Sequence, residues 1–173
     1  DHPWAREHPE YFIETDKEFY EKYGRNEFCP VTDKNGTVHY LAHGRDPNYP
    51  AWADTLQLNY ANPELKEAMK QQLLALVDHC DGVRCDMAML PLNNIFYNTW
   101  IGVLKKYGFE KPEKEFWEDA IAQVKIIRDD FIFIAETYWD LEWQLQNLGF
   151  DFTYDKRLTD RLVGGNIRSI KDH

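Results

Sequence analysis

The chain has 173 residues, and 43% of them are apolar, which is enough to form a core and excludes wholesale disorder. No stretch approaches the roughly 18 apolar residues that a membrane-spanning helix needs. The formal net charge of −10 argues against nucleic acid as the main partner, because phosphate binding requires a basic patch. We therefore expect a globular chain with neither a membrane nor a nucleic acid as its partner.

Residues 1–60 are rich in Pro, Gly, Asn, aromatic and charged side chains, and we expect them to form a loop-rich subdomain. Two apolar runs, residues 28–31 and 37–41, flank the dipeptide Asn35-Gly36. Asn-Gly between such runs predicts a β-hairpin. Residues 14–23 are expected to form a short helix.

Residues 61–173 alternate between helical and strand patterns. The first helix begins at Asn62-Pro63-Glu64, with Asn as the N-cap and Pro at the first helical position. Such alternation predicts right-handed crossovers and a parallel sheet. The expected helices cover residues 62–79, 92–107, 113–128, 141–148 and 158–170, and the expected strands cover residues 82–86, 131–135 and 150–154.

The three cysteines, Cys29, Cys80 and Cys85, are odd in number and lack metal-site spacing, so we expect reduced thiols rather than disulfides. Unpaired thiols favour a cytoplasmic protein, although the sequence leaves the compartment open. His39 and His43 are four residues apart, but they fall at the exit of the expected hairpin and not on a helix. We predict neither a metal site nor a cofactor.

The two ends of the chain are interpreted as cut. The first residue is Asp1 rather than Met, without a signal-peptide pattern, and the chain stops at His173 inside an expected helix. We therefore expect a piece of a longer protein.

Two carboxylates are expected at the carboxyl ends of parallel strands, where function gathers in such sheets. Asp86 closes the expected strand 82–86, and Glu136 directly follows the expected strand 131–135. Neighbouring strands are about 4.8 Å apart, so the two acids can reach the separation of about 5–5.5 Å that retaining glycosidases use. The alternative is that both acids are ordinary solvated ends of strands.

Arg84 is two residues before Asp86 and so shares its face of the strand. A cation there would keep Asp86 ionised and oriented, as a nucleophile requires, although such a pair is often only a surface ion pair. Glu136 follows five apolar residues, and the desolvation expected there would raise its pKa and suit a general acid. Tyr138, Trp139 and Trp143 could stack on sugar rings or belong to the core.

Several motifs of this sequence resemble motifs of the α-amylase family of glycoside hydrolases, and they occur in the same order as in that family. The similarity runs through nearly the whole chain. The family's nucleophile motif is similar to Asp81-Gly82-Val83-Arg84-Cys85-Asp86, and its general-acid motif is similar to Phe133-Ile134-Ala135-Glu136-Thr137-Tyr138-Trp139. Its passage from the loop subdomain back into the barrel is similar to Trp52-Ala53-Asp54-Thr55-Leu56-Gln57-Leu58-Asn59-Tyr60-Ala61-Asn62-Pro63-Glu64.

The resemblance implies an α/β fold, a partial TIM (β/α)8 barrel of about three parallel strands with a loop-rich hairpin subdomain before it. By position, Asp86 and Glu136 would be catalytic, as nucleophile and general acid. Arg84, Tyr138 and Trp139 would contact an α-glucan or oligosaccharide substrate. The family also uses a third carboxylate on a later strand, and nothing in this sequence matches that motif.

The implied activity is retaining hydrolysis of α-glucosidic bonds, with the isolated chain inactive. A transglycosylase of the same family and a catalytically inactive barrel that serves as a binding subunit remain alternatives. A complete barrel takes about 250 residues, so the expected three strands leave open edges. Through these edges we expect the chain to self-associate.

Overall fold

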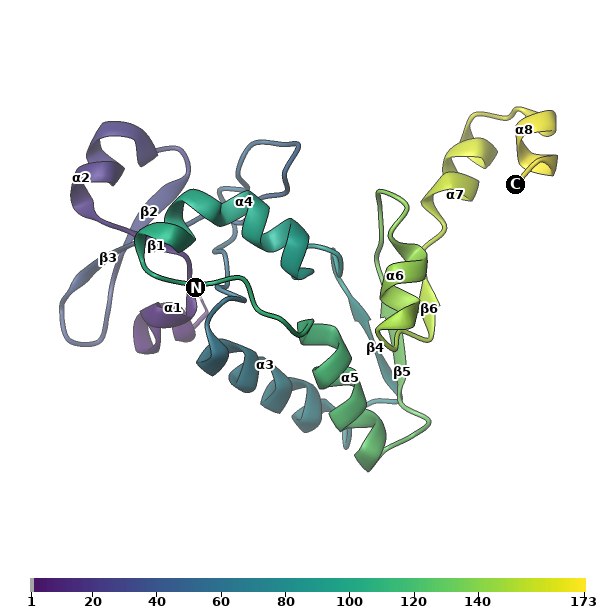
Figure 1. Cartoon of the computed structure of the whole chain (residues 1–173), viewed down its shortest axis with the longest axis horizontal. Helices are drawn as coiled ribbons and strands as arrows, with labels where there is room; N and C mark the ends of the chain where they lie inside the picture. Colours follow the sequence, from purple (N-terminus) through teal and green to yellow (C-terminus); the bar gives the residue numbers. More distant parts are fainter. Residues whose placement is uncertain (1) are drawn as a thin grey trace. The chain divides into compact units, whose positions relative to one another are not determined.

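The computed structural model describes residues 2–173 and divides into two compact units (Figure 1). The first unit comprises the residues up to 70 together with residues 93–113, and the second comprises residues 71–92 and 114–173. Helix α3 (Pro63–Leu76) contributes residues to both units. The expected boundary near residue 61, between a loop-rich subdomain and a partial barrel, stays a prediction.

The first unit contains an antiparallel sheet with the strand order β1-β3-β2. The predicted hairpin is confirmed, because Phe28 pairs with Ala42 and Thr32 with Val38, and Gly36 between the strands has the left-handed φ of 87° that glycine permits. The other elements of this unit are short, apart from one long helix. The elements are α1 (Trp4–Glu7), the 3₁₀ helix η1 (Pro9–Tyr11), β1 (Glu14–Thr15), α2 (Lys17–Phe19), the π-helical η2 (Tyr20–Gly24), β2 (Phe28–Thr32), β3 (Val38–Ala42) and α4 (Asn93–Lys106).

The prediction of a single helix over residues 14–23 is wrong. Glu14 and Thr15 form strand β1, because they pair with β3 at the edge of the sheet. The helix begins only after Asp16, whose carboxylate accepts a hydrogen bond from the backbone N–H of Phe19. Pairing with β3 therefore makes Glu14 and Thr15 a strand, although the local sequence pattern of this segment favours a helix.

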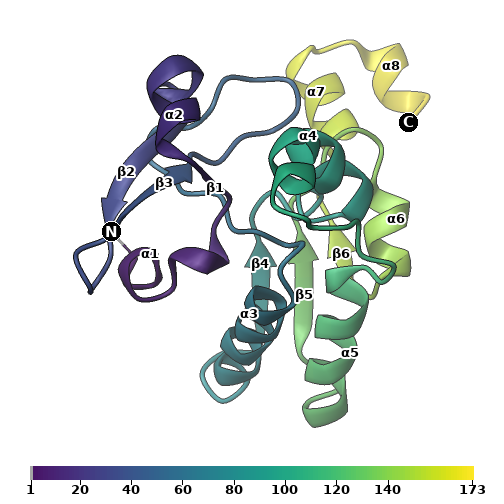
Figure 2. The ribbon, with the colours of Figure 1, turned by 60° about the vertical axis from the view of Figure 1, so that its left-hand side comes forward.

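The second unit contains a parallel sheet with the strand order β4-β5-β6. Figure 2 shows β4 and β5 running side by side in the same direction. The helices and strands of this unit are β4 (Gly82–Cys85), α5 (Phe116–Ile127), β5 (Ile132–Ala135), α6 (Glu142–Asn147), β6 (Phe152–Thr153), α7 (Lys156–Val163) and α8 (Ile167–Lys171). The predicted parallel sheet is confirmed, whereas the helix expected over residues 158–170 is divided at Gly164-Gly165.

An aromatic core fixes β5 in the second unit. Phe131 and Phe133 are fully buried, and Phe133 and Trp117 of α5 both make edge contacts with Phe150. The indole N–H of Trp117 donates to the backbone oxygen of Ala88, just after β4, at 2.7 Å. The strand that carries Glu136 and the loop after Asp86 are therefore both held by the same packed helix.

The register between β4 and β5 places their carboxyl ends level. Arg84 pairs with Ile134 and Cys85 with Ala135, so the next residue of each strand, Asp86 or Glu136, comes at the same edge. Strands β4 and β6 are the edge strands of this sheet in the described chain. Self-association through such edges stays a prediction.

None of the helices in residues 2–173 combines the length and apolar character that crossing a membrane requires.

Candidate active site

The side chains of β4 alternate between the two faces of the sheet. Cys85 is buried, whereas Arg84 and Asp86 are exposed, as the two-residue period of a strand requires. Burial raises the pKa of the Cys85 thiol to about 12, against a smaller opposing effect of Arg84. Cys85 is thus an inert core thiol, and its two neighbours carry the polar chemistry of this strand.

The backbone locks the end of β4 to the end of β5. The N–H of Glu136 donates to the carbonyl oxygen of Cys85 at 3.0 Å, and the N–H of Ala88 donates to the carbonyl oxygen of Glu136 at 3.0 Å. Between these bonds, Met87 has a left-handed φ of 45°, which is rare for a residue with a side chain and typical of functional sites. The positions of Asp86 and Glu136 are therefore set by sheet pairing as well as by side-chain contacts.

Arg84 joins the two carboxylates. Its Nη1 lies 2.5 Å from Asp86 Oδ1 and its Nη2 lies 2.9 Å from Glu136 Oε2. Its Nε donates to the hydroxyl of Tyr154 at 2.8 Å. The hydrogen bond to Tyr154, followed by the one to Asp86, raises the pKa of the guanidinium above its ordinary value, so Arg84 is a permanent cation between the two acids.

The two carboxylates differ in exposure. The Asp86 side chain is 74% exposed, whereas the Glu136 side chain is 12% exposed. An accessible carboxylate held by a cation suits attack on an incoming substrate, and a buried carboxyl suits proton transfer. The division of roles between the two acids stays a prediction.

Glu136 is buried as predicted, but its surroundings are polar rather than apolar. Its Oε2 accepts a hydrogen bond from the backbone N–H of Met87 at 2.8 Å and forms an ion pair with Arg84 Nη2 at 2.9 Å. Its Oε1 accepts a hydrogen bond from the Tyr138 hydroxyl at 2.7 Å. The five apolar residues before Glu136 indicate only the environment along its own strand. Two of the polar groups around its carboxylate come from elsewhere: Arg84 from β4 and the Met87 N–H from the loop that follows β4.

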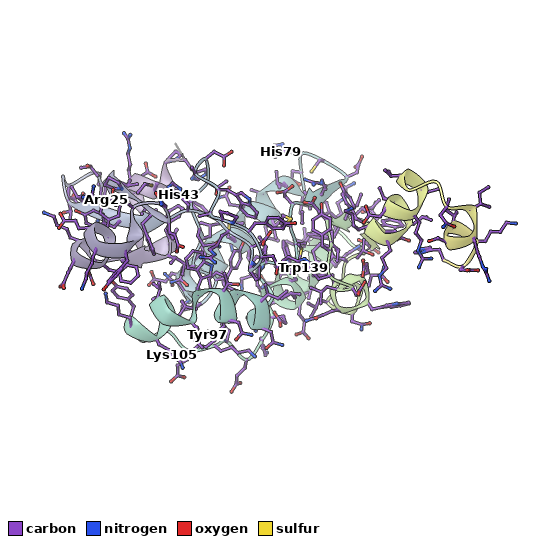
Figure 3. All side chains as sticks on the ribbon, turned by 90° about the horizontal axis from the view of Figure 1, so that it is seen from above. Arg25, His43, His79, Tyr97, Lys105 and Trp139 are labelled. Atoms are coloured by element: carbon purple, nitrogen blue, oxygen red, sulfur yellow. The ribbon has the colours of Figure 1, made fainter. Side chains whose placement is uncertain are left out.

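The predicted substrate-binding aromatic residues lie in different environments. Tyr138 contacts Glu136, and this hydrogen bond, together with burial, raises the pKa of the phenol to about 12. Trp139, labelled in Figure 3, is 39% exposed and has a left-handed φ of 63°. Trp143 on α6 is 76% exposed. Neither tryptophan is a core residue, so an exposed aromatic surface follows Glu136.

Tyr154 belongs to the site and was missed by the sequence analysis. It directly follows β6, as Asp86 follows β4 and Glu136 follows β5. The Tyr154 hydroxyl accepts the hydrogen bond from Arg84. In addition, the guanidinium carbon of Arg84 lies 5.5 Å from the centroid of the Tyr154 ring. The signal was available, since a polar residue at the end of the third parallel strand has the same position as the two acids.

The histidines singled out in the sequence do not form a metal site. His39 contacts Glu14 at 2.8 Å and Asp33 at 3.5 Å, while His43 contacts the backbone oxygen of Thr55. Within residues 2–173, no three His, Cys, Asp or Glu side chains gather in a way that could hold a metal ion.

Solved structures of α-amylase-type enzymes match the chain, although no protein-family model and no curated protein sequence matches it. Amy13B of Eubacterium rectale matches with a TM-score of 0.50 and 13% identity, over 99% of this chain and 36% of that one. An α-amylase of Anoxybacillus matches with a TM-score of 0.50 and 17% identity, over 76% of this chain and 29% of that one.

A third match is the cyclic α-maltosyl-(1→6)-maltose hydrolase of Arthrobacter globiformis, which was solved in complex with cyclic α-maltosyl-(1→6)-maltose. Its TM-score is 0.49 and its identity 18%, over 84% of this chain and 29% of that one.

The first two matches establish the fold. The chain spans about a third of the length of these structures and has the mixed α/β fold of part of an α-amylase domain. The fold class predicted from the sequence is therefore confirmed, with a parallel sheet and helices following an antiparallel sheet.

Proposed function

We propose that this chain supplies the nucleophile and the general acid of a retaining glycoside hydrolase of the α-amylase family, acting on α-glucosidic bonds. The single observation that carries the proposal is the guanidinium of Arg84, which contacts Asp86 and Glu136 at the ends of adjacent parallel strands. The fold match and the sequence motifs around both acids support the same assignment.

In the first step, an Asp86 oxygen attacks the anomeric carbon of the sugar while Glu136 gives its proton to the leaving glycosidic oxygen. The C–O bond to the leaving group breaks and a covalent glycosyl-enzyme forms on Asp86. In the second step, Glu136 takes a proton from water, whose oxygen attacks the same carbon and releases Asp86. The two attacks give net retention of configuration.

The contacts of Glu136 indicate which oxygen carries the proton. Oε2 accepts a hydrogen bond from the backbone N–H of Met87 and pairs with the Arg84 cation, and both of these partners favour an oxygen without a proton. Oε1 contacts only the Tyr138 hydroxyl among the described residues, and a hydroxyl can rotate to accept as well as donate. We therefore assign the transferred proton to Oε1.

The chain by itself is expected to be inactive. The family resemblance requires a third carboxylate, and no motif in the 173 residues corresponds to it. Activity is therefore proposed for a complete catalytic domain that contains this chain, with an α-glucan or oligosaccharide as substrate. Measurable turnover by the chain alone would contradict this requirement.

The test is hydrolysis of malto-oligosaccharides by such a complete domain and its variants. Glu136→Gln should lower kcat by roughly 10²–10⁴-fold, and Asp86→Asn by at least as much. Asp81→Asn is the matched control, because this exposed residue precedes β4 and pairs with Arg128 at the other end of the strand. Near-normal activity in either of the first two variants would refute the assignment.

A further inference from the structure

Tyr154 is fixed to the strand that carries Glu136. Thr153 pairs with Ala135 in the sheet, and the backbone N–H of Tyr154 donates to the carbonyl oxygen of Ala135 at 2.9 Å. Ala135 immediately precedes Glu136. The main chain of Tyr154 and the main chain of Glu136 are therefore held by neighbouring bonds of one sheet, and neither can move far without the other.

The side chain of Tyr154 extends this fixed point to Arg84 on β4. Its hydroxyl accepts the Arg84 Nε–H at 2.8 Å, and its ring centroid lies 5.5 Å from the guanidinium carbon. The contact joins two residues that are 70 positions apart in sequence. It therefore spans all three strands of the parallel sheet, from β6 to β4.

Because the guanidinium is planar, the hydrogen bond between Tyr154 and Arg84 affects the orientation of the whole group. Because its nitrogens form a rigid planar fork, a contact at Nε restricts how the plane can turn about the two ion pairs that Nη1 and Nη2 make with Asp86 and Glu136. The Arg84 side chain is 44% exposed and has several rotatable bonds. The Tyr154 hydroxyl therefore adds a third restraint to the two that the ion pairs supply.

We propose that Tyr154 is a positioning residue that orients Arg84 across the nucleophile and the general acid, an inference that rests on the function proposed above. Tyr154 acts through Arg84. Its removal leaves both carboxylates on their paired strands but loosens the cation that bridges them. The expected consequence is slower chemistry with little change in substrate binding.

The first measurement follows the contact itself, by NMR on the 173-residue chain, and does not depend on activity. In Tyr154→Phe the ring stays and only the hydroxyl is lost. The Arg84 Nε–H should then exchange with water about 10-fold faster, since a hydrogen bond involving a charged group is removed. Tyr49→Phe, an exposed loop tyrosine of the first unit, is the matched control and should leave this signal unchanged.

The second measurement is turnover of malto-oligosaccharides by the complete domain. Tyr154→Phe should lower kcat by about 10-fold with KM nearly unchanged, because misplacement of a catalytic group costs rate rather than binding. Unchanged kcat, or a rise in KM alone, would overturn the positioning role. Unchanged Nε–H exchange would overturn it as well.

The two measurements separate this inference from the proposed function. An unmutated domain that cleaves no α-glucan would refute the proposed function and the effect on kcat. The exchange experiment would still decide whether Tyr154 holds Arg84. Faster exchange together with lower kcat in Tyr154→Phe supports both.

Discussion

The backbone N–H of Met87 donates to Glu136 Oε2 at 2.8 Å, and so joins the loop after β4 to the buried acid after β5. Met87 directly follows Asp86 and has a left-handed φ of 45°. A strained residue kept between two carboxylates indicates that the surrounding sheet imposes the geometry. The site is thus organised by backbone pairing before any substrate is bound.

Replacing Arg84 by lysine tests whether the guanidinium or only its charge is needed. Lysine keeps the cation but has a single nitrogen, which cannot reproduce the fork that contacts Asp86, Glu136 and Tyr154. We expect Arg84→Lys to lower kcat of the complete domain by about 10²-fold. Arg25→Lys, at an exposed position of the first unit, should leave kcat unchanged. Full activity in Arg84→Lys would show that charge alone is sufficient.

The pKa of Tyr138 gives a test in the alkaline range. The hydrogen bond to Glu136, followed by burial, raises this pKa from 10.0 to about 12. Between about pH 10 and 12 the unfolded chain therefore loses a proton that the folded chain keeps. By linkage, this group's contribution to stability is complete below pH 10 and is lost as the pH rises through that window.

The measurement is the ultraviolet absorbance of ionised phenol during a pH titration of the folded chain. The difference in absorbance between the unmutated chain and Tyr138→Phe isolates the Tyr138 phenol. This difference should titrate near pH 12. Glu136→Gln should bring the midpoint back towards 10.0, the ordinary value, because the negative acceptor is gone. A difference titration already centred near 10 in the parent would contradict the contact between the two residues.

Much of this geometry could be predicted from the sequence, because it depends on local periodicity and on the rule for parallel sheets. Asp86 and Glu136 each follow a strand of four residues, and parallel pairing brings the ends of adjacent strands together whatever the loops between them do. The shared face of Arg84 and Asp86 follows from the two-residue period alone. These parts needed no knowledge of side-chain packing.

The rest depends on contacts between segments far apart in sequence. The polar surroundings of Glu136 come from Arg84 and Met87, about 50 residues earlier, so the apolar run before Glu136 predicts its burial but not these contacts. Tyr154 reaches Arg84 only because β6 pairs with β5. Likewise, residues 14–15 become a strand because β3 offers a pairing edge, which no helical pattern within the segment indicates.

Gly82 tests the close approach of β4 to β5. A Cβ at this position would lie 2.4 Å from the carbonyl oxygen of Ile132 and 2.8 Å from its Cβ, and the backbone cannot yield without disturbing the register. We expect Gly82→Ala to lower the free energy of unfolding by about 1–3 kcal/mol.

The matched control is Gly102→Ala. Gly102 lies within α4, and nothing lies within 4 Å of an added Cβ, so alanine should raise stability by about 0.5–1 kcal/mol through its helix propensity. Denaturant unfolding followed by tryptophan fluorescence measures both variants. A neutral or stabilising Gly82→Ala would show that the two strands are not paired as described.

Trp139 offers an exposed indole on the loop that follows Glu136. If it stacks on a sugar ring, Trp139→Ala should raise KM for malto-oligosaccharides by about 5- to 10-fold, since such contacts of aromatic faces are worth about 1 kcal/mol. The change in kcat should be smaller. Tyr49→Ala, which removes an exposed aromatic side chain from a loop of the first unit, is the control. Equal effects of both variants would exclude a specific role for Trp139.

The most direct test of the central claim is to trap the covalent intermediate on Asp86. In a complete domain carrying Glu136→Gln, an α-glucosyl fluoride needs no acid to lose fluoride, so the C–F bond breaks as an Asp86 oxygen bonds to the anomeric carbon. Hydrolysis of this ester is then slow because its general base is missing. Mass spectrometry of the digested protein should find one glucosyl group, on the peptide that contains Asp86. Labelling of a different residue would contradict the account. So would hydrolysis of the fluoride, with retention of configuration, by a domain that carries Asp86→Asn.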